Sequence, residues 1–279
     1  SWQFFNEINN VFRYLKPADV VAWHDRMARW LEANDPYGHP RTTSFGSRGE
    51  HPPMWKLETM DYANWHLYLN WGGRYRHPAP MAEEVARRFL HDYDKPVCIS
   101  EFGTSGRGWK PEIDPYLRGL HQAVWGGIMA GSSGTAMPWW WQKMHAANVH
   151  ATLWRPLARF LEGTGFGGPE WAPVPLPRPP EGAPRVLAYA MSDGKQVLLW
   201  AIDPACNYPN GAKAEHPAVC TGASVRLPAM SAGPYKVEYW DTRTGAAVGS
   251  GDLVSEGDGL RVALPPFRVD IAARIQGVQ

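Results

Sequence analysis

A cluster of prolines divides the chain into two unequal parts. Between residues 169 and 184, seven of the sixteen residues are proline. Because proline lacks a backbone N–H and has a fixed φ, this density excludes helix and sheet and favours a stiff, extended connector. The sequence therefore predicts domains over 1–168 and 185–279, joined by a linker over 169–184.

The first part alternates short β-rich runs with helical patterns. Strands are expected over 2–5, 41–45, 61–68, 97–102 and 135–141. Helices are expected over 17–33, 81–93 and 116–129, and a last one carries Leu153, Leu157, Phe160 and Leu161. This alternation is typical of α/β units built on a parallel sheet. The helix over 17–33 is expected to be amphipathic, with one face formed by Val20, Trp23, Met27, Trp30 and Leu31.

The second part contains seven short alternating runs separated by turn sequences. They lie at 186–191, 196–203, 224–227, 235–241, 247–254, 260–264 and 269–273. Short strands at this spacing predict an antiparallel β-sandwich. Cys206 and Cys220 flank a polar loop here, and the sequence leaves open whether they form a disulfide, which would indicate an oxidising compartment.

Composition excludes several classes of partner. The 279 residues carry 28 basic and 27 acidic side chains, so the net charge of +1 provides no electrostatic footprint for nucleic acid or an anionic membrane. No apolar run approaches the roughly 20 residues of a membrane-spanning helix, and no glycine-rich phosphate loop follows an expected strand. The 15 tryptophans suggest flat apolar walls for sugar rings, although a tryptophan-rich core explains about half of them equally well.

Two carboxylates stand at the ends of expected strands. Glu7 follows the first strand, beside Asn6, and Glu101 ends the strand over 97–102. In a parallel α/β barrel the catalytic groups come from the carboxyl ends of strands. Two carboxyl groups about 5 Å apart can cleave a glycosidic bond with retention of configuration. The alternative is that each residue is an ordinary surface or salt-bridged glutamate.

Four motifs together resemble a known group of enzymes. Phe5-Asn6-Glu7, His66-Leu67-Tyr68, Ile99-Ser100-Glu101-Phe102-Gly103 and Trp139-Trp140-Trp141 resemble the fourth, sixth, seventh and eighth strands of clan A glycoside hydrolases, which include the family five cellulases and mannanases. The resemblance implies a partial (β/α)8 (TIM-type) barrel covering about strands four to eight, followed by the antiparallel β-sandwich. It also implies a retaining β-glycosidase acting on plant-type β-glycans or oligosaccharides.

The resemblance implies a role for several residues. Glu101 would be the nucleophile and Glu7 the acid/base, while Asn6 would bind the sugar 2-hydroxyl and Tyr68 would hydrogen-bond Glu101. Further substrate-binding candidates are His66, Trp71, Trp139 and Trp141. Strand alternation places Trp139 and Trp141 on one face of the expected strand. A histidine in a strand is nearly as often a core residue as a substrate-binding one, which applies to His66. Trp71 lies in a loop whose exposure to solvent would explain it equally well. No metal and no cofactor are expected, because His145 and His150 are five residues apart and nothing nearby completes a site.

The remaining expectations concern assembly and context. Residues 233–245 resemble the small β-sandwich that follows the barrel in many bacterial clan A enzymes, where it is mostly a packing partner and sometimes a carbohydrate-binding module. A secreted or periplasmic bacterial protein is expected. About 165 residues remain for a barrel that usually needs about 250, so two sheet edges are expected to be open. A homo-oligomer, expected to be a dimer, would cover them; a cleaved fragment and a non-catalytic relative are the alternatives. The alternative functions are a catalytically silent carbohydrate-binding protein and an exo-acting β-galactosidase or β-glucosidase.

Overall fold

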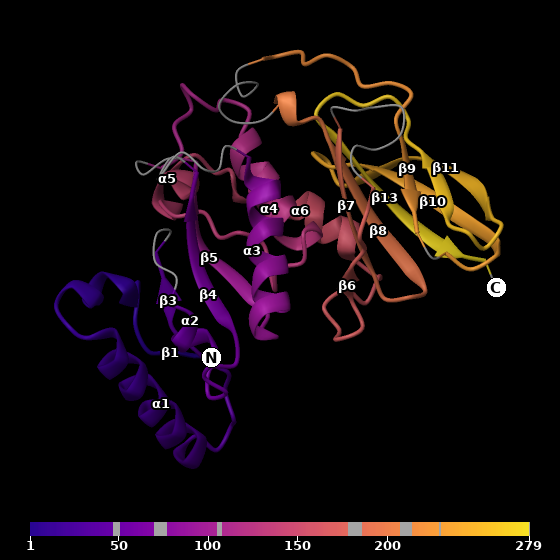
Figure 1. Ribbon diagram of the computed structural model, residues 1–279. Helices are drawn as coiled ribbons and strands as arrows, with labels where there is room; N and C mark the ends of the chain where they lie inside the picture. Colours follow the sequence, from indigo (N-terminus) through magenta and orange to yellow (C-terminus); the bar gives the residue numbers. More distant parts are fainter. Residues whose placement is uncertain are drawn as a thin grey trace.

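The computed structural model describes residues 1–46, 51–69, 77–104, 108–177, 186–206, 214–228 and 230–278. Figure 1 shows two parts, one of helices and short parallel strands and one of antiparallel sheets, with α3 and α4 lying between them. The expected Trp71 site falls outside the described residues. Among the residues that are described, no helix has both the length and the apolar character that crossing a bilayer requires.

The first part carries parallel strands, as the alternation predicted. The strands are β1 (Trp2–Gln3), β2 (Arg41–Thr42), β3 (Ser44–Phe45), β4 (Ala63–Tyr68) and β5 (Val97–Gly103). β1 pairs with β2, and β3, β4 and β5 follow one another in a second sheet, all in parallel. Because parallel strands point the same way, their carboxyl ends meet at one edge.

The prediction of a regular strand over 135–141 is wrong. Pro138 forms an isolated parallel bridge with Phe102, and the Met137 and Trp139 N–H groups donate to carbonyls of β5 at 2.9 and 2.8 Å. The chain then turns at Trp140, whose φ is 59°, and Trp141 begins helix α5 (Trp141–Ala146). The segment therefore follows β5 for three residues only, and side-chain alternation cannot be extended to Trp141.

The other helices lie close to their expected positions. They are α1 (Pro17–Asn34), α2 (Pro52–Trp55), α3 (Pro78–Tyr93), α4 (Arg118–Met129) and α6 (His150–Leu161), with short 3₁₀ helices η1 (Ile8–Arg13) and η2 (Pro204–Cys206). Of the expected apolar face of α1, Val20 is buried, but Trp23 and Trp30 are exposed, and His24 and Ala28 complete the buried face instead. His24 lies 3.2 Å from the Thr43 hydroxyl, so this face packs closely on the strands.

The second part consists of two antiparallel sheets. The strands are β6 (Ala172–Pro173), β7 (Leu187–Ser192), β8 (Gln196–Ile202), β9 (Ser224–Leu227), β10 (Gly233–Asp241), β11 (Ala246–Ser255), β12 (Leu260–Ala263) and β13 (Asp270–Gly277). Six of them form one sheet in the order β11-β10-β13-β8-β7-β6, and β12 pairs with β9 in the other. β6 corrects the expectation that the proline cluster excludes sheet: it is an edge strand, where proline needs no ladder donor.

The two parts share a hydrophobic core. One face of the six-stranded sheet packs with β9 and β12, while the other face contributes Tyr189, Leu198 and Trp200 to the core that contains α3 and α4. Within this junction, His121 on α4 lies 2.7 Å from the Asp270 carboxylate on β13, and both side chains are at most 1% exposed. The junction is therefore a packed interface with a buried polar pair.

The cysteines of the second part are thiols. Cys220 Sγ donates to Asp203 Oδ2 at 3.3 Å, and Cys206 Sγ lies 3.7 Å from the Arg268 carbonyl oxygen. The disulfide that the sequence left open is absent, so the cysteines provide no argument for an oxidising compartment.

Candidate active site

The strand ends bring four of the expected site residues together. Glu7 follows β1, His66 and Tyr68 end β4, and Glu101 lies near the end of β5. An irregularity in the β4–β5 pairing decides the arrangement: Trp65 is opposite Ile99, but His66 is opposite Glu101. The additional residue of β5 at this point is what places the Glu101 carboxylate beside the imidazole.

His66 lies between the two carboxylates. Its Nδ1 is 2.9 Å from Glu7 Oε1 and 3.1 Å from Glu101 Oε2. One atom from each of these three side chains lies within 4.8 Å of the others. Because the ionised Glu101 oxygen can only accept a hydrogen bond, Nδ1 carries a proton, and this proton also faces Glu7 Oε1. The Tyr68 hydroxyl adds a second donor to Glu101 Oε2 at 2.6 Å, which is the hydrogen bond that the resemblance implied.

Burial and hydrogen bonding act in opposite directions on Glu101. Its side chain is 12% exposed, and that burial raises its pKa. Hydrogen bonds from His66 and Tyr68 and the charge of His66 outweigh this effect, so the pKa of Glu101 is lowered and the carboxylate is ionised. Burial, the hydrogen bond to Glu101 and the charges of both glutamates raise the pKa of Tyr68, which therefore stays a donor.

The tryptophans are arranged differently from the expectation. Trp139 and Trp141 are 45% and 56% exposed, and their contact with substrate stays a prediction. Trp140 instead packs edge-on against Tyr68 with a centroid distance of 5.8 Å. A Cβ atom on Gly108 would lie only 2.7 Å from the Trp140 ring, so glycine lets the chain approach that ring. Sequence reasoning missed Trp140 because the assumed strand pointed it away from the site.

Asn6 is exposed beside Glu7. Its Oδ1 lies 3.2 Å from the Ser44 hydroxyl, which holds it near the site without covering it. Two further residues, Ser44 and Asn10, contact Glu7 directly. Both are uncharged and lie outside the strand-end motifs, so no signal in the sequence distinguished them.

The three charged groups are also placed as ligands of a metal ion could be. Glu7, His66 and Glu101 are the described residues whose ligand atoms converge in this way. An ion would need His66 Nδ1 deprotonated, whereas its two contacts at 2.9 and 3.1 Å have the length of hydrogen bonds to carboxylates. The cluster therefore fits a hydrogen-bonded arrangement, and the expectation that no metal is needed stays a prediction.

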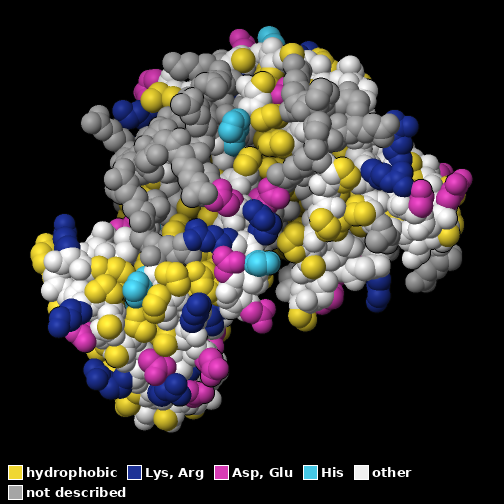
Figure 2. Space-filling model, in the orientation of Figure 1, with side chains coloured by type: hydrophobic (Ala, Val, Ile, Leu, Met, Phe, Trp, Pro, Cys, Tyr) yellow, Lys and Arg dark blue, Asp and Glu magenta, His cyan; other side chains and the backbone are white. Residues whose placement is uncertain are grey.

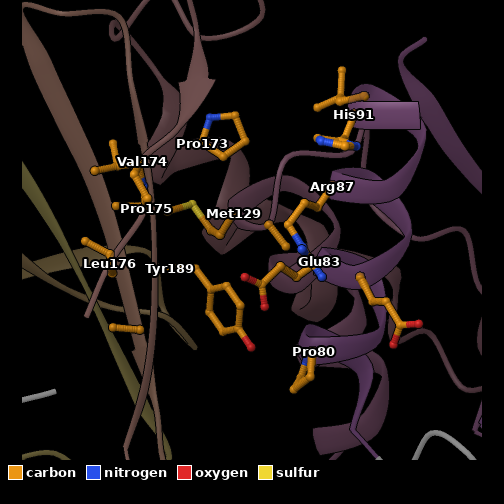
Figure 3. A pocket seen from close by; sticks show the side chains of 15 residues that line it. Pro80, Glu83, Arg87, His91, Met129, Pro173, Val174, Pro175, Leu176 and Tyr189 are labelled. Atoms are coloured by element: carbon orange, nitrogen blue, oxygen red, sulfur yellow. The ribbon is translucent and has the colours of Figure 1, made fainter. Parts of the chain in front are cut away.

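A separate groove of about 1110 Å³ lies at the junction of the two parts (Figure 3). Glu83, Arg87 and His91 line it from α3, and Tyr189 lines it from β7. Charged side chains gather between the two parts on this face of the molecule (Figure 2). None of the four strand-end residues lines this groove, so it is distinct from the carboxylate site.

Comparisons with known proteins place the fold. Neither a protein-family model nor a curated protein matches the sequence. A solved structure described as a glycoside hydrolase has a TM-score of 0.52 and 13% identity, over 90% of this chain and 60% of its own length. A family 5 glycoside hydrolase from Bacteroides vulgatus ATCC 8482 has a TM-score of 0.52 and 14% identity, over 91% of this chain and 60% of its own. This chain shares the fold of these two glycoside hydrolases over the part of them that it covers.

A third solved structure extends the comparison. It is a family 44 xyloglucanase from Paenibacillus polymyxa, with a TM-score of 0.50 and 10% identity, over 98% of this chain and 65% of its own. This chain spans about 60% of the length of the first two matches. The expected likeness to this group is thus confirmed at the level of the fold.

Proposed function

We propose that this protein is a retaining β-glycoside hydrolase that acts on plant-type β-glycans or their oligosaccharides. The observation that supports it is the separation of the carboxylates: one oxygen of Glu7 and one of Glu101 lie within 4.8 Å. Retaining glycosidases hold their two carboxyl groups about 5–5.5 Å apart, whereas inverting enzymes need about 6.5–9.5 Å to admit a water molecule.

The two glutamates divide the first step between them. The ionised Glu101 attacks the anomeric carbon while Glu7 gives its proton to the departing glycosidic oxygen. The bond from the anomeric carbon to that oxygen breaks, the alcohol leaves, and an ester joins the sugar to Glu101. The lowered pKa of Glu101 supports its role as the nucleophile, because it is ionised when the acid must still hold a proton.

The second step reverses the proton transfer. Glu7 takes a proton from water as the water oxygen attacks the anomeric carbon, and the ester bond to Glu101 breaks. His66 suits both steps, because its Nδ1–H faces an oxygen of each glutamate. When Glu101 is esterified, the same N–H can donate its hydrogen bond to the carboxylate of Glu7.

Sugar contacts complete the proposal. Asn6 is exposed beside Glu7 and would bind the 2-hydroxyl, an interaction that strengthens as the transition state forms. Trp140, held against Tyr68, supplies an apolar ring next to the nucleophile, and Trp139 and Trp141 would extend the wall outward.

A dimer that covers the open edge of β1, where Trp2 is 47% exposed, belongs to the same proposal and is tested by a molar-mass measurement.

The experiment is a screen of aryl β-glycosides with Glu101→Ala and Glu7→Ala. On a phenyl glycoside, whose leaving group requires an acid, each substitution is expected to lower kcat/KM by more than about a thousandfold, because each removes a group that acts on the reacting bond. Glu58→Ala is the matched control, since Glu58 is an exposed glutamate away from the strand ends. Nuclear magnetic resonance of the first product should show the β anomer. Unchanged turnover in both variants would leave a catalytically silent carbohydrate-binding protein as the function.

A further inference from the structure

The backbone at Glu7 is held in an unusual conformation. Glu7 lies between β1 and η1 with φ 51° and ψ 53°, in the left-handed region. A residue other than glycine keeps this conformation only where the surrounding structure fixes it, and such residues cluster at functional sites. The contacts that fix Glu7 are therefore informative about how its carboxylate is aimed.

Ser44 fixes the backbone of Glu7. The fully buried Ser44 hydroxyl accepts the Glu7 N–H at 2.9 Å and the Gln3 amide at 3.2 Å. A hydroxyl has one proton to donate, and Asn6 Oδ1 lies 3.2 Å away to receive it. One oxygen on β3 thus joins the main chain of Glu7 to the side chain of Asn6.

Asn10 fixes the carboxylate of Glu7. Its Nδ2 donates to Glu7 Oε2 at 2.9 Å from within η1. The amide nitrogen therefore faces the carboxyl group and fixes the position of Oε2. On the other side, a Cβ atom on Gly46 would lie 3.2 Å from Glu7 Oε1, so glycine leaves that oxygen room beside His66.

We propose that Ser44 and Asn10 are positioning residues that aim Glu7 for proton transfer, Ser44 through the backbone and Asn10 through Oε2. The inference rests on the proposed function, since it assigns a task to the acid/base of that reaction. The Glu101 carboxylate is held by different partners, His66 and Tyr68. Their removal should therefore impair the steps that need acid or base assistance and spare nucleophilic attack itself.

Leaving-group dependence separates positioning from general structural damage. A 2,4-dinitrophenyl glycoside loses an alcohol that needs no protonation, whereas a phenyl glycoside requires an acid. In Ser44→Ala and Asn10→Ala, kcat/KM for the phenyl glycoside is expected to fall at least about tenfold further than for the dinitrophenyl glycoside. Added azide, which attacks without base assistance, should accelerate turnover of the dinitrophenyl substrate more in these variants than in the parent.

The matched control is Asn34→Ala. It removes another asparagine side-chain hydrogen bond, from Nδ2 to the Trp30 carbonyl at 2.7 Å, at the far end of α1. It should leave the ratio between the two substrates unchanged. Because Asn10 is exposed, Asn10→Ala tests the inference even where Ser44→Ala fails to fold.

The outcomes distinguish this inference from the proposed function. An equal loss on both glycosides, or no loss, in the folded variants overturns the positioning role while Glu7→Ala still abolishes phenyl glycoside turnover. If Glu7→Ala itself leaves that turnover intact, the proposed function is wrong, and the positioning role is overturned with it.

Discussion

Replacing His121 with alanine is expected to lower the free energy of unfolding by about 3–5 kcal/mol, because the buried Asp270 carboxylate would lose a hydrogen-bond donor and its negative charge would be left poorly compensated. The Asp270 side chain is 1% exposed and lies 2.7 Å from His121 Nε2. After the substitution, Asp270 still accepts from Trp200 Nε1 at 2.9 Å and Thr242 Oγ1 at 2.7 Å. It loses the donor from α4, so the carboxylate on β13 is left without a hydrogen-bond partner across the junction.

The pH dependence of stability provides a second readout of the same pair. Burial lowers the pKa of His121, although the charge of Asp270 opposes it. Burial raises the pKa of Asp270, but the hydrogen bonds from His121, Thr242 and Trp200 outweigh this effect, so the pKa of Asp270 is lowered as well. The unfolded chain therefore binds more protons than the folded one, and stability falls as the pH drops below about 6.5, where an unfolded histidine protonates. The His121→Ala variant should show a shallower fall.

Urea unfolding followed by tryptophan fluorescence measures the effect. With a slope of about 3 kcal/mol per molar urea, the midpoint should fall by about 1–2 M. A single transition is expected because the two parts share a core. His145→Ala is the control, since His145 is exposed and surface substitutions change stability by about 0.5 kcal/mol or less. A loss below about 1 kcal/mol, the range of exposed ion pairs, would refute the reasoning.

Three further results are expected. Tyr68→Phe should move the acidic limb of the kcat/KM profile to higher pH, because it removes a donor that lowers the pKa of the carboxylate beside it; a limb that stays in place would contradict this. Gly108→Ala should displace Trp140, raising KM and costing about 1–3 kcal/mol of stability in a thermal melt. Dithiothreitol should leave the melting temperature unchanged, because Cys206 and Cys220 are thiols; a fall of more than about 4 °C would contradict the structure.

The carboxylate pair could be predicted because parallel strands impose it. Glu7 follows one β-rich run and Glu101 lies near the end of another. The carboxyl ends of parallel strands meet at one edge of a sheet, and this does not depend on the conformation of the loops. The hydrogen bond from Tyr68 followed from the resemblance. The pairing irregularity that places His66 opposite Glu101 has no such signal, because it depends on how two strands meet rather than on either sequence alone.

Two other expectations failed for reasons of packing. On α1, periodicity favoured the large residues Trp23 and Trp30, which are 37% and 59% exposed. The helix instead packs through Val20, His24 and Ala28, because small side chains allow a close approach to the strands. For the segment over 135–141, an apolar run alone could not reveal the left-handed turn at Trp140 that ends the pairing.

The pairing of β6 with β7 has a consequence for how a long substrate would be handled. The segment that follows α6 joins the antiparallel sheet at Ala172. The face of that sheet that points away from β9 and β12 is buried against α4. A module on a free tether can search along a polymer independently of its enzyme. Here the two parts share one hydrophobic core, so the second part is not held by such a tether alone. On the proposed function, a sugar chain that contacted both parts of the protein would reach Glu7 and Glu101 at a constant distance from its contact with the second part. That distance, rather than the diffusion of a tethered module, would then set the spacing between cleaved bonds.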